Sequence, residues 1–301
     1  MLSRTDIVKE LGKGISFYPF SGEKIKGNAL NLTVSEYAWT LCSGSIWIDS
    51  SNNAYSVPPP SLLNECIEYK LFEKQSAVIE HKGAKCVVLL PFSTTLIETN
   101  EVISLGNNIG GEYNSKVKMV SKGTCHIGTY LEPNYRGHSL IAIHSISPIP
   151  ILLPINSVFA AITFFYLHRE VPKSLRGAMG SRFEILSSVG ISLSEHEKDF
   201  LSAQWKNDTD EIKIKMISDS IYKVFVKNEK RKALEGIKKY LNVQNMFVLV
   251  SMFLFLFFTY KTAQFIDIST NRTVWVDRFW NVGCSGIIIC ILGALAKLFK
   301  K

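Results

Sequence analysis

The sequence predicts a mainly β N-terminal domain, a helical linker and a two-helix transmembrane hairpin at the C-terminal end. Three observations support this fold class. Short apolar stretches alternate with turn-forming residues up to about residue 168, which is typical of strands joined by turns. A helical apolar stripe begins after residue 194, and two apolar runs lie beyond residue 245, each close to the length of a membrane-spanning helix.

Strands of the first domain are predicted from apolar runs such as CVVLL at residues 86–90 and AAITFFY at residues 160–166. Prolines punctuate this region at residues 58–60 and at residues 148, 150 and 154. Proline cannot donate a ladder hydrogen bond, so these positions suit edges and turns. Residues 169–191 contain Pro172, Gly177, Gly180 and Gly190, and we expect a tail or linker there.

The helical linker begins at Ser194, which forms a predicted capping box with Glu197 three residues later. Apolar residues then recur at helical spacing up to residue 225, with an interruption around residues 207–210. Two interpretations of this stripe stay open. It packs against the β domain, or it mediates self-association between subunits.

Two transmembrane helices are predicted at residues 243–262 and 279–296, which are almost free of charged side chains. The alternative is a buried hydrophobic hairpin in a globular protein, but residues 253–258 offer no polar face. Basic residues flank the runs, and the N-terminus carries no apolar export segment. We therefore expect a multi-pass inner-membrane protein whose N-terminal domain and C-terminus are cytoplasmic.

The net charge of +8 is concentrated beside the apolar runs, so the lipid bilayer is a simpler partner for it than nucleic acid. Six cysteines occur without a CxxC pair or a Cys/His cluster of zinc-ligand spacing. The sequence therefore predicts no metal site.

Three motifs follow one another along the chain. They are IKGNALNL at residues 25–32, LEPNYRG at residues 131–137 and RGAMGSR at residues 176–182. In this order they resemble the dCTP deaminase and dUTPase superfamily. The resemblance implies a dUTPase-like distorted β-barrel or jelly-roll over residues 1–182, and a homotrimer with sites between subunits. Residues 183–242 are then the linker, and residues 243–301 the membrane segment.

The chemistry of this superfamily is only partly retained. Deaminases of the family place a glutamate five residues after the hairpin glycine, and counting from Gly137 gives Ala142. A methyl group cannot accept a proton, so we expect no family-type deamination. Glu132 stands where dUTPases use an aspartate to activate water. It is one methylene longer, and it is interpreted either as a weak hydrolytic base or as a surface hairpin residue.

Nucleotide-binding candidates follow from the same resemblance. Tyr135 and Arg136 belong to the hairpin motif, Ser115 and Lys116 to the segment that precedes it, and Arg176, Ser181 and Arg182 to the tail motif. Lysine and arginine can receive a phosphate. The alternatives are a solvated loop lysine at position 116, a Tyr135 ring that fills the base of the hairpin, and an Arg136 that holds structure through a carboxylate pair. No cofactor is predicted, except Mg²⁺ accompanying a bound nucleoside triphosphate.

Three functional hypotheses remain open at this point. The first is a non-catalytic effector that senses a nucleotide, a regulatory protein or a ribonucleoprotein and acts through its membrane helices, by analogy a membrane-disrupting antiphage defence effector. The second is a membrane-tethered deoxynucleoside triphosphate pyrophosphatase that uses Glu132. The third is a protein-binding membrane scaffold.

Overall fold

The computed structural model describes residues 1–125, 128–172, 175, 180, 182–240, 253, 257, 260 and 261. The chain divides into two compact units, residues 1–226 and residues 227–301. The fold described below belongs to the first unit. The predicted domain boundaries near residues 182 and 242 stay a prediction.

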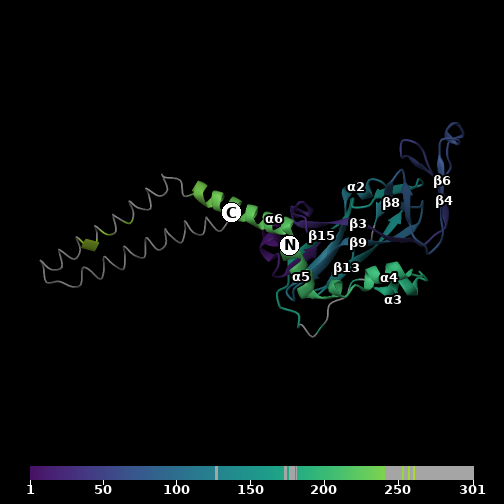
Figure 1. Ribbon diagram of the computed structural model, residues 1–301. Coiled ribbons are helices and arrows are strands. Elements are labelled where there is room, and N and C mark those ends of the chain that lie inside the picture. The colour runs from purple at the N-terminus through teal and green to yellow at the C-terminus, as the bar shows by residue number, and fades with distance from the viewer. Residues whose placement is uncertain are drawn as a thin grey trace. The chain divides into compact units, whose positions relative to one another are not determined.

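Nine strands form the main sheet in the described part of the chain (Figure 1). Their order is β11-β13-β9-β3-β15-β10-β12, with β1 beside β9 and β2 beside β3. The bounds are β1 Ile15–Tyr18, β2 Ile25–Lys26, β3 Ala29–Thr40, β9 Thr94–Leu105, β10 Ile109–Ser115, β11 Thr124–Cys125, β12 Tyr130–Leu131, β13 Arg136–Ser145 and β15 Val158–Tyr166. All nine pair antiparallel.

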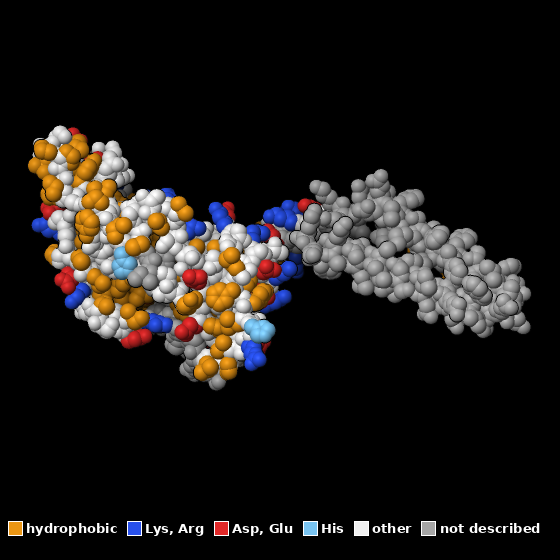
Figure 2. Space-filling view, turned by 180° about the vertical axis from the view of Figure 1, so that it is seen from behind, with side chains coloured by type: hydrophobic (Ala, Val, Ile, Leu, Met, Phe, Trp, Pro, Cys, Tyr) orange, Lys and Arg blue, Asp and Glu red, His pale blue; other side chains and the backbone are white. Residues whose placement is uncertain are grey.

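Two smaller sheets complete the β structure. One has the order β14-β8-β7, and the other β5-β4-β6. Their bounds are β4 Gly44–Ile48, β5 Ala54–Tyr55, β6 Ile67–Leu71, β7 Val78–His81, β8 Ala84–Leu89 and β14 Ile151–Pro154. Figure 2 shows apolar side chains on the projecting part of the molecule where β4 and β6 lie, and Val57, Leu63, Ile67 and Phe72 are exposed there.

Apolar runs of the sequence become the buried strands, as predicted. Residues 86–90 include most of β8, and residues 160–166 lie in β15. Most of their side chains, among them Val87 and Phe164, join one large cluster that also contains Phe17, Leu32 and Ile97. The mainly β nature of the first unit is therefore confirmed.

Helices lie at both ends of the first unit. Helix α1 (Arg4–Glu10) begins the chain, and short helical segments η1 (Gly22–Lys24), η2 (Pro60–Leu62) and α2 (Val117–Val120) lie between strands. After the sheet come α3 (Phe183–Ser188), α4 (Glu195–Ser202), η3 (Gln204–Asn207), α5 (Thr209–Ser218) and α6 (Ser220–Tyr240). The expected capping box at Ser194 is present, because its side chain accepts from the Glu197 amide.

The predictions of a transmembrane hairpin and of an inner-membrane location were wrong. No helix in the described part of the chain is both long enough and apolar enough to cross a membrane. Helix α6 has 21 residues, but a charged side chain occurs at nearly every turn, among them Lys223, Lys227, Arg231 and Lys238. The segments predicted as spans, residues 243–262 and 279–296, lie outside the described residues except at positions 253, 257, 260 and 261.

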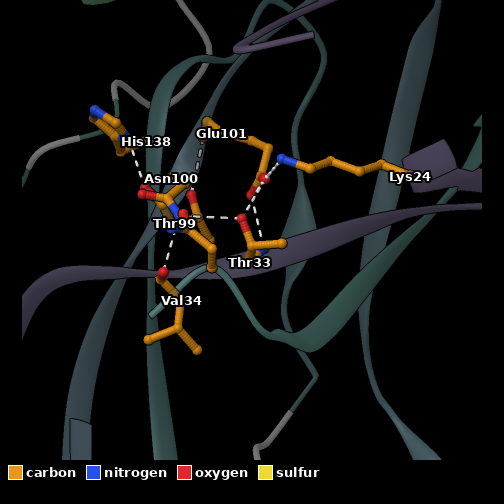
Figure 3. Close-up of polar contacts among 8 residues, drawn as sticks. Lys24, Thr33, Val34, Thr99, Asn100, Glu101 and His138 are labelled. Carbon is orange, nitrogen blue, oxygen red and sulfur yellow. Dashed lines mark hydrogen bonds and ion pairs between the residues drawn. The ribbon is translucent and has the colours of Figure 1, made fainter. Parts of the chain in front are cut away.

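A buried polar network fastens β3 to β9 (Figure 3). The Glu101 carboxylate accepts from the Thr33 amide at 2.8 Å and from the Thr33 hydroxyl at 2.6 Å, and it pairs with the Lys24 ammonium. The Asn100 amide donates to the Val34 carbonyl at 2.8 Å. Because these groups satisfy one another, the network fixes the register of β3 against β9, the strand that pairs with β13 on its other side.

Candidate functional site

A cavity of about 470 Å³ opens beside the hairpin that joins β12 to β13. Strand β13 forms one wall, Tyr113 of β10 another, and the beginning of α3 a third. The lining residues are Leu96, Tyr113, Thr129, Tyr130, Glu132, Tyr135, His138, Ser139, Leu140, Ala142, Gly180, Arg182 and Ile185. Hairpin and tail residues far apart in the sequence thus meet at one site.

Two glycines bring the tail onto the hairpin. Gly137 has φ +125°, and a Cβ there would lie 2.5 Å from the Gly180 Cα. The Gly180 amide donates to the Arg136 carbonyl at 2.7 Å. Only a residue without a side chain allows this approach, and it carries Arg182 to the rim of the cavity.

Predicted site residues divide into two groups. Glu132, Tyr135 and Arg182 line the cavity, as does Ala142. Ser115 and Lys116 do not line it, and the Lys116 ammonium donates to the Asn31 side-chain oxygen at 2.8 Å.

Arg136 lies outside the cavity lining as well. Its guanidinium donates to the Asn207 carbonyl at 2.8 Å and so ties the hairpin to η3. Arg176 and Ser181 fall outside the described residues.

Uncharged hydroxyls provide the polar surface of the inner wall. The Tyr113 and Ser139 hydroxyls are 2.6 Å apart, and the Tyr135 hydroxyl donates to the His138 carbonyl. Burial raises the pKa of both tyrosines above the ordinary phenol range. Both phenols therefore stay protonated at neutral pH and can orient a polar ligand by hydrogen bonds.

The position expected for the deaminase carboxylate is apolar in three dimensions as well as in sequence. Ala142 pairs with Leu96 of β9, and both side chains line the cavity. Glu132, which also belongs to the lining, is exposed. Among the described residues, no group of three or more metal-ligating side chains occurs. The cavity can hold a polar ligand, but the wall position that carries the glutamate in the resembled deaminases is occupied by the methyl group of Ala142.

Sequence reasoning missed a buried ionisable cluster, namely Glu98, His138 and Lys206, of which His138 lines the cavity. Burial raises the pKa of Glu98 to about 8, against a smaller opposing effect of Lys206. Burial also lowers the pKa of His138 to about 3 and that of Lys206 to about 8. The only sequence signal was a pair of acidic residues, Glu98 and Glu101, inside the strand sequence TTLIETNEVISL.

The chain shows sequence similarity to a dCTP deaminase. No family model matches it. A dUMP-forming dCTP deaminase of Beutenbergia cavernae is 22% identical over 191 residues, which cover 61% of this chain and 89% of that protein. The predicted resemblance to dCTP deaminases is confirmed at this level of similarity.

Solved structures of the same two enzyme types are also similar. The dCTP deaminase of Agrobacterium tumefaciens gives a TM-score of 0.37 at 15% identity, covering 57% of this chain. The chain spans 50% of that structure. The EIAV dUTPase gives a TM-score of 0.26 at 18% identity, covering 32% of this chain and 88% of the dUTPase.

Proposed function

We propose that the first unit binds a pyrimidine deoxynucleotide in the cavity and does not deaminate it by the route that the resemblance implies. The observation that carries this proposal is Ala142 on the cavity wall, beside the hairpin and tail residues Tyr135 and Arg182. Binding needs donors and a cation, which these residues offer. Deamination needs a group that carries a proton from water to the leaving ammonia, and a methyl group cannot do so.

A substitution of Arg182, the cationic residue of the cavity lining, tests whether the cavity binds a nucleotide. Arg182→Ala removes the guanidinium that would meet a phosphate. Calorimetric titration with dCTP and dUTP is expected to show an affinity loss of about tenfold or more, since a charge-assisted hydrogen bond contributes roughly 1.5–3 kcal/mol. Lys122→Ala is the matched control, because Lys122 is exposed and lies outside the cavity lining. Equal affinities for wild type and Arg182→Ala would sink the assignment.

A second candidate function is hydrolysis of a deoxynucleoside triphosphate. Its support is Glu132, which lines the cavity and could activate water for attack on phosphorus. This support is a single exposed carboxylate, and its side chain is one methylene longer than the aspartate of the resembled dUTPases. Pyrophosphate release by the wild type that disappears in Glu132→Ala, with nucleotide binding retained, would favour this candidate over the first.

We also propose that the chain works as a homo-oligomer, a trimer by its resemblance to the superfamily. The supporting observation is Tyr130, which lines the cavity and is 77% exposed. A large ring beside a ligand site is well placed to be covered by a neighbouring subunit. If the protein acts as a nucleotide sensor, we propose that a regulatory protein binds the nucleotide-bound form in preference to the empty one.

A further inference from the structure

The segment from α3 to η3, residues 183–207, covers one face of the main sheet, and we call it the cover. Its side chains Leu186, Ile191 and Leu201 are buried against Tyr37 and Trp39 of β3. The Trp39 indole also donates to the Glu197 carboxylate of α4 at 2.8 Å. The cover therefore lies over strands β3, β9 and β13, directly beside the cavity that Arg182 and Ile185 help to line.

Phe200 of the cover lies between two aromatic rings of the sheet. Its ring centroid is 3.7 Å from that of Tyr37, with 16° between the planes, and 4.9 Å from that of His138, with 30° between the planes. Tyr37 belongs to β3 and His138 to β13, and β9 runs between these strands. Two strand spacings come to about 9.6 Å, so a single planar ring fits between side chains that stand on the two outer strands. We call this space the ring slot.

Glu98 lies on the face of the sheet that the cover buries, where Leu96 and Leu140 pack with Phe200. It belongs to the central strand β9 and pairs with Leu140, two residues from the Leu96–Ala142 pair, so it projects from the same face as those cavity residues. Glu98 is completely buried, and neither of its carboxyl oxygens has a hydrogen-bond partner. A phenyl ring above it offers no donor or acceptor to either oxygen.

His138 adds a second unsatisfied atom to the same place. Its Nδ1 lies 2.7 Å from the Thr99 carbonyl, as Figure 3 shows, so Nδ1 donates and Nε2 is left as an acceptor. Nε2 is buried without a partner. Lys206 of the cover meanwhile lies over the Phe200 ring, with its ammonium 3.1 Å from the ring centroid. The slot thus has two aromatic walls and polar atoms that its present occupant cannot satisfy.

We propose that the ring slot is a binding site for the planar base of a nucleotide, and that Phe200 of the cover occupies this site in the ligand-free protein. A base would stack on Tyr37 and His138, donate a hydrogen bond to His138 Nε2, and exchange hydrogen bonds with the Glu98 carboxyl group. Phe200 and Lys206 leave together, because both belong to the cover. The nucleotide base and the Phe200 ring therefore cannot occupy the ring slot at the same time.

The ring slot deepens the proposed function and rests on it. His138 lines both the slot and the cavity, so a sugar and phosphate in the cavity place a base within reach of the slot. The cover also leads through η3 into α5, and Arg136 holds the Asn207 carbonyl at that junction. Displacing Phe200 therefore gives nucleotide binding a direct mechanical effect on the helices that follow the sheet.

Calorimetry with two ligands separates the slot from the cavity. The probes are dCMP and 2-deoxyribose 5-phosphate, which carries the sugar and phosphate without a base. Phe200→Ala is expected to tighten dCMP binding about tenfold. A minor conformation is typically populated at roughly 0.1–10%, and the apparent affinity falls by that fraction when only the open state binds. Glu98→Leu is expected to weaken dCMP binding about tenfold or more. Neither change should alter the affinity for 2-deoxyribose 5-phosphate.

Matched controls guard against general loosening of the fold. Phe225→Ala removes a phenyl ring that packs on Phe20, outside the cover, and is expected to leave both affinities unchanged. Phe200→Leu keeps an apolar plug and is expected to behave nearly as the wild type. In addition, saturating dCMP should speed amide hydrogen exchange in residues 195–206.

The outcomes distinguish the ring slot from nucleotide binding in the cavity. If Phe200→Ala and Glu98→Leu change the two affinities equally, or leave dCMP binding unchanged, the ring slot is wrong and nucleotide binding in the cavity stands. Slower exchange in the cover on dCMP binding also overturns the slot. If neither probe binds the wild type or Phe200→Ala, both the slot and the proposed function fail.

Discussion

Glu98 is the residue whose environment is hardest to explain by packing alone. Its neighbours on the same face are Leu96 and Leu140, and a leucine there would avoid desolvating a carboxyl group. Burying an unpartnered polar group costs on the order of 1–3 kcal/mol in proteins. Buried titratable groups of this kind gather at functional sites, and this is why the ring slot centres on Glu98.

The protonation of Glu98 predicts a specific dependence of stability on pH. The ordinary carboxyl pKa is 4.5, and burial raises it to about 8 in the folded protein. Between these values the unfolded chain releases the proton and the folded chain keeps it, so stability is complete below pH 4.5 and is lost as pH rises toward 8. The loss approaches about 1.4 kcal/mol per pH unit. Glu98→Gln removes this contribution, because an amide does not titrate.

Urea unfolding of wild type and Glu98→Gln at pH 5.5 and pH 8.5 measures the effect. We expect the variant to gain stability relative to the wild type at the higher pH. His138 and Lys206 titrate in both proteins, so the difference isolates position 98 to the extent that the substitution leaves their pKa values unchanged. Parallel pH profiles for the two proteins would show that Glu98 is already ionised in the fold.

His138 predicts the opposite behaviour on the acid side. Burial lowers its pKa from 6.5 to about 3, so below pH 6.5 the unfolded chain binds a proton that the folded chain refuses. Stability is complete above pH 6.5 and is lost as pH falls toward 3. The same urea series in wild type and His138→Gln, read at pH 7 and pH 4.5, should show a smaller acid loss in the variant. An equal loss in both proteins would contradict a buried neutral imidazole.

Helix α4 shows how one side chain can serve two elements. The Glu197 carboxylate accepts from the Ser194 amide at 2.7 Å, which closes the capping box, and its other oxygen accepts from the Trp39 indole. The first contact joins residues three apart, whereas the second joins α4 to β3 across the fold. Glu197 therefore anchors the cover to the sheet as well as starting its helix.

Glu197→Ala should destabilise the first unit by about 1–3 kcal/mol, since it removes the cap and leaves the buried Trp39 indole without its acceptor. Glu195→Ala is the matched control in the same helical turn, where the Glu195 carboxylate pairs with Lys198 at the surface. Thermal or urea unfolding compares them, and the control is expected to change stability by less than about 1 kcal/mol. Equal losses would mean that the indole contact contributes nothing.

At the level of elements, the sequence predicted what depends on local pattern. The capping box at Ser194 needs residues three apart, and the strands in residues 86–90 and 160–166 follow from apolar runs. The stacking of Phe200 between Tyr37 and His138 depends on strands that pair far apart in the sequence, which no local pattern contains. The family resemblance made Lys116 a phosphate-binding candidate, and in the fold its ammonium donates to the Asn31 side-chain oxygen.

The whole first unit combines a site with a cover over the same sheet. The hairpin motif at residues 131–137 and Gly180 of the tail motif meet because Gly137 and Gly180 allow backbone contact, which no local pattern in the sequence indicated. Composition suggested a membrane hairpin, and this prediction was wrong for the helices in the described part of the chain. High apolar content indicates burial of some kind, but it does not by itself specify the surroundings.

Oligomerisation is the prediction that belongs to the whole molecule. Tyr130→Ser replaces an exposed ring at the cavity rim with a small polar side chain. If a second subunit covers this rim, the variant should sediment as smaller particles and bind dCTP more weakly. Sedimentation velocity and calorimetry on the same samples check both effects, and Phe92→Ser, at an exposed ring outside the cavity lining, is the control. A variant that dissociates with unchanged affinity would place the site within one subunit.

The central claim is that the cavity holds a deoxynucleotide without deaminating it, because Ala142 replaces the proton-carrying carboxylate. The most direct measurement incubates the full chain with dCTP at a concentration that calorimetry shows to be saturating, and follows ammonia release and the conversion of cytosine to uracil. The account predicts saturable dCTP binding and no ammonia above the uncatalysed rate. Stoichiometric or catalytic ammonia release by the wild type, or the absence of any dCTP binding, would contradict it.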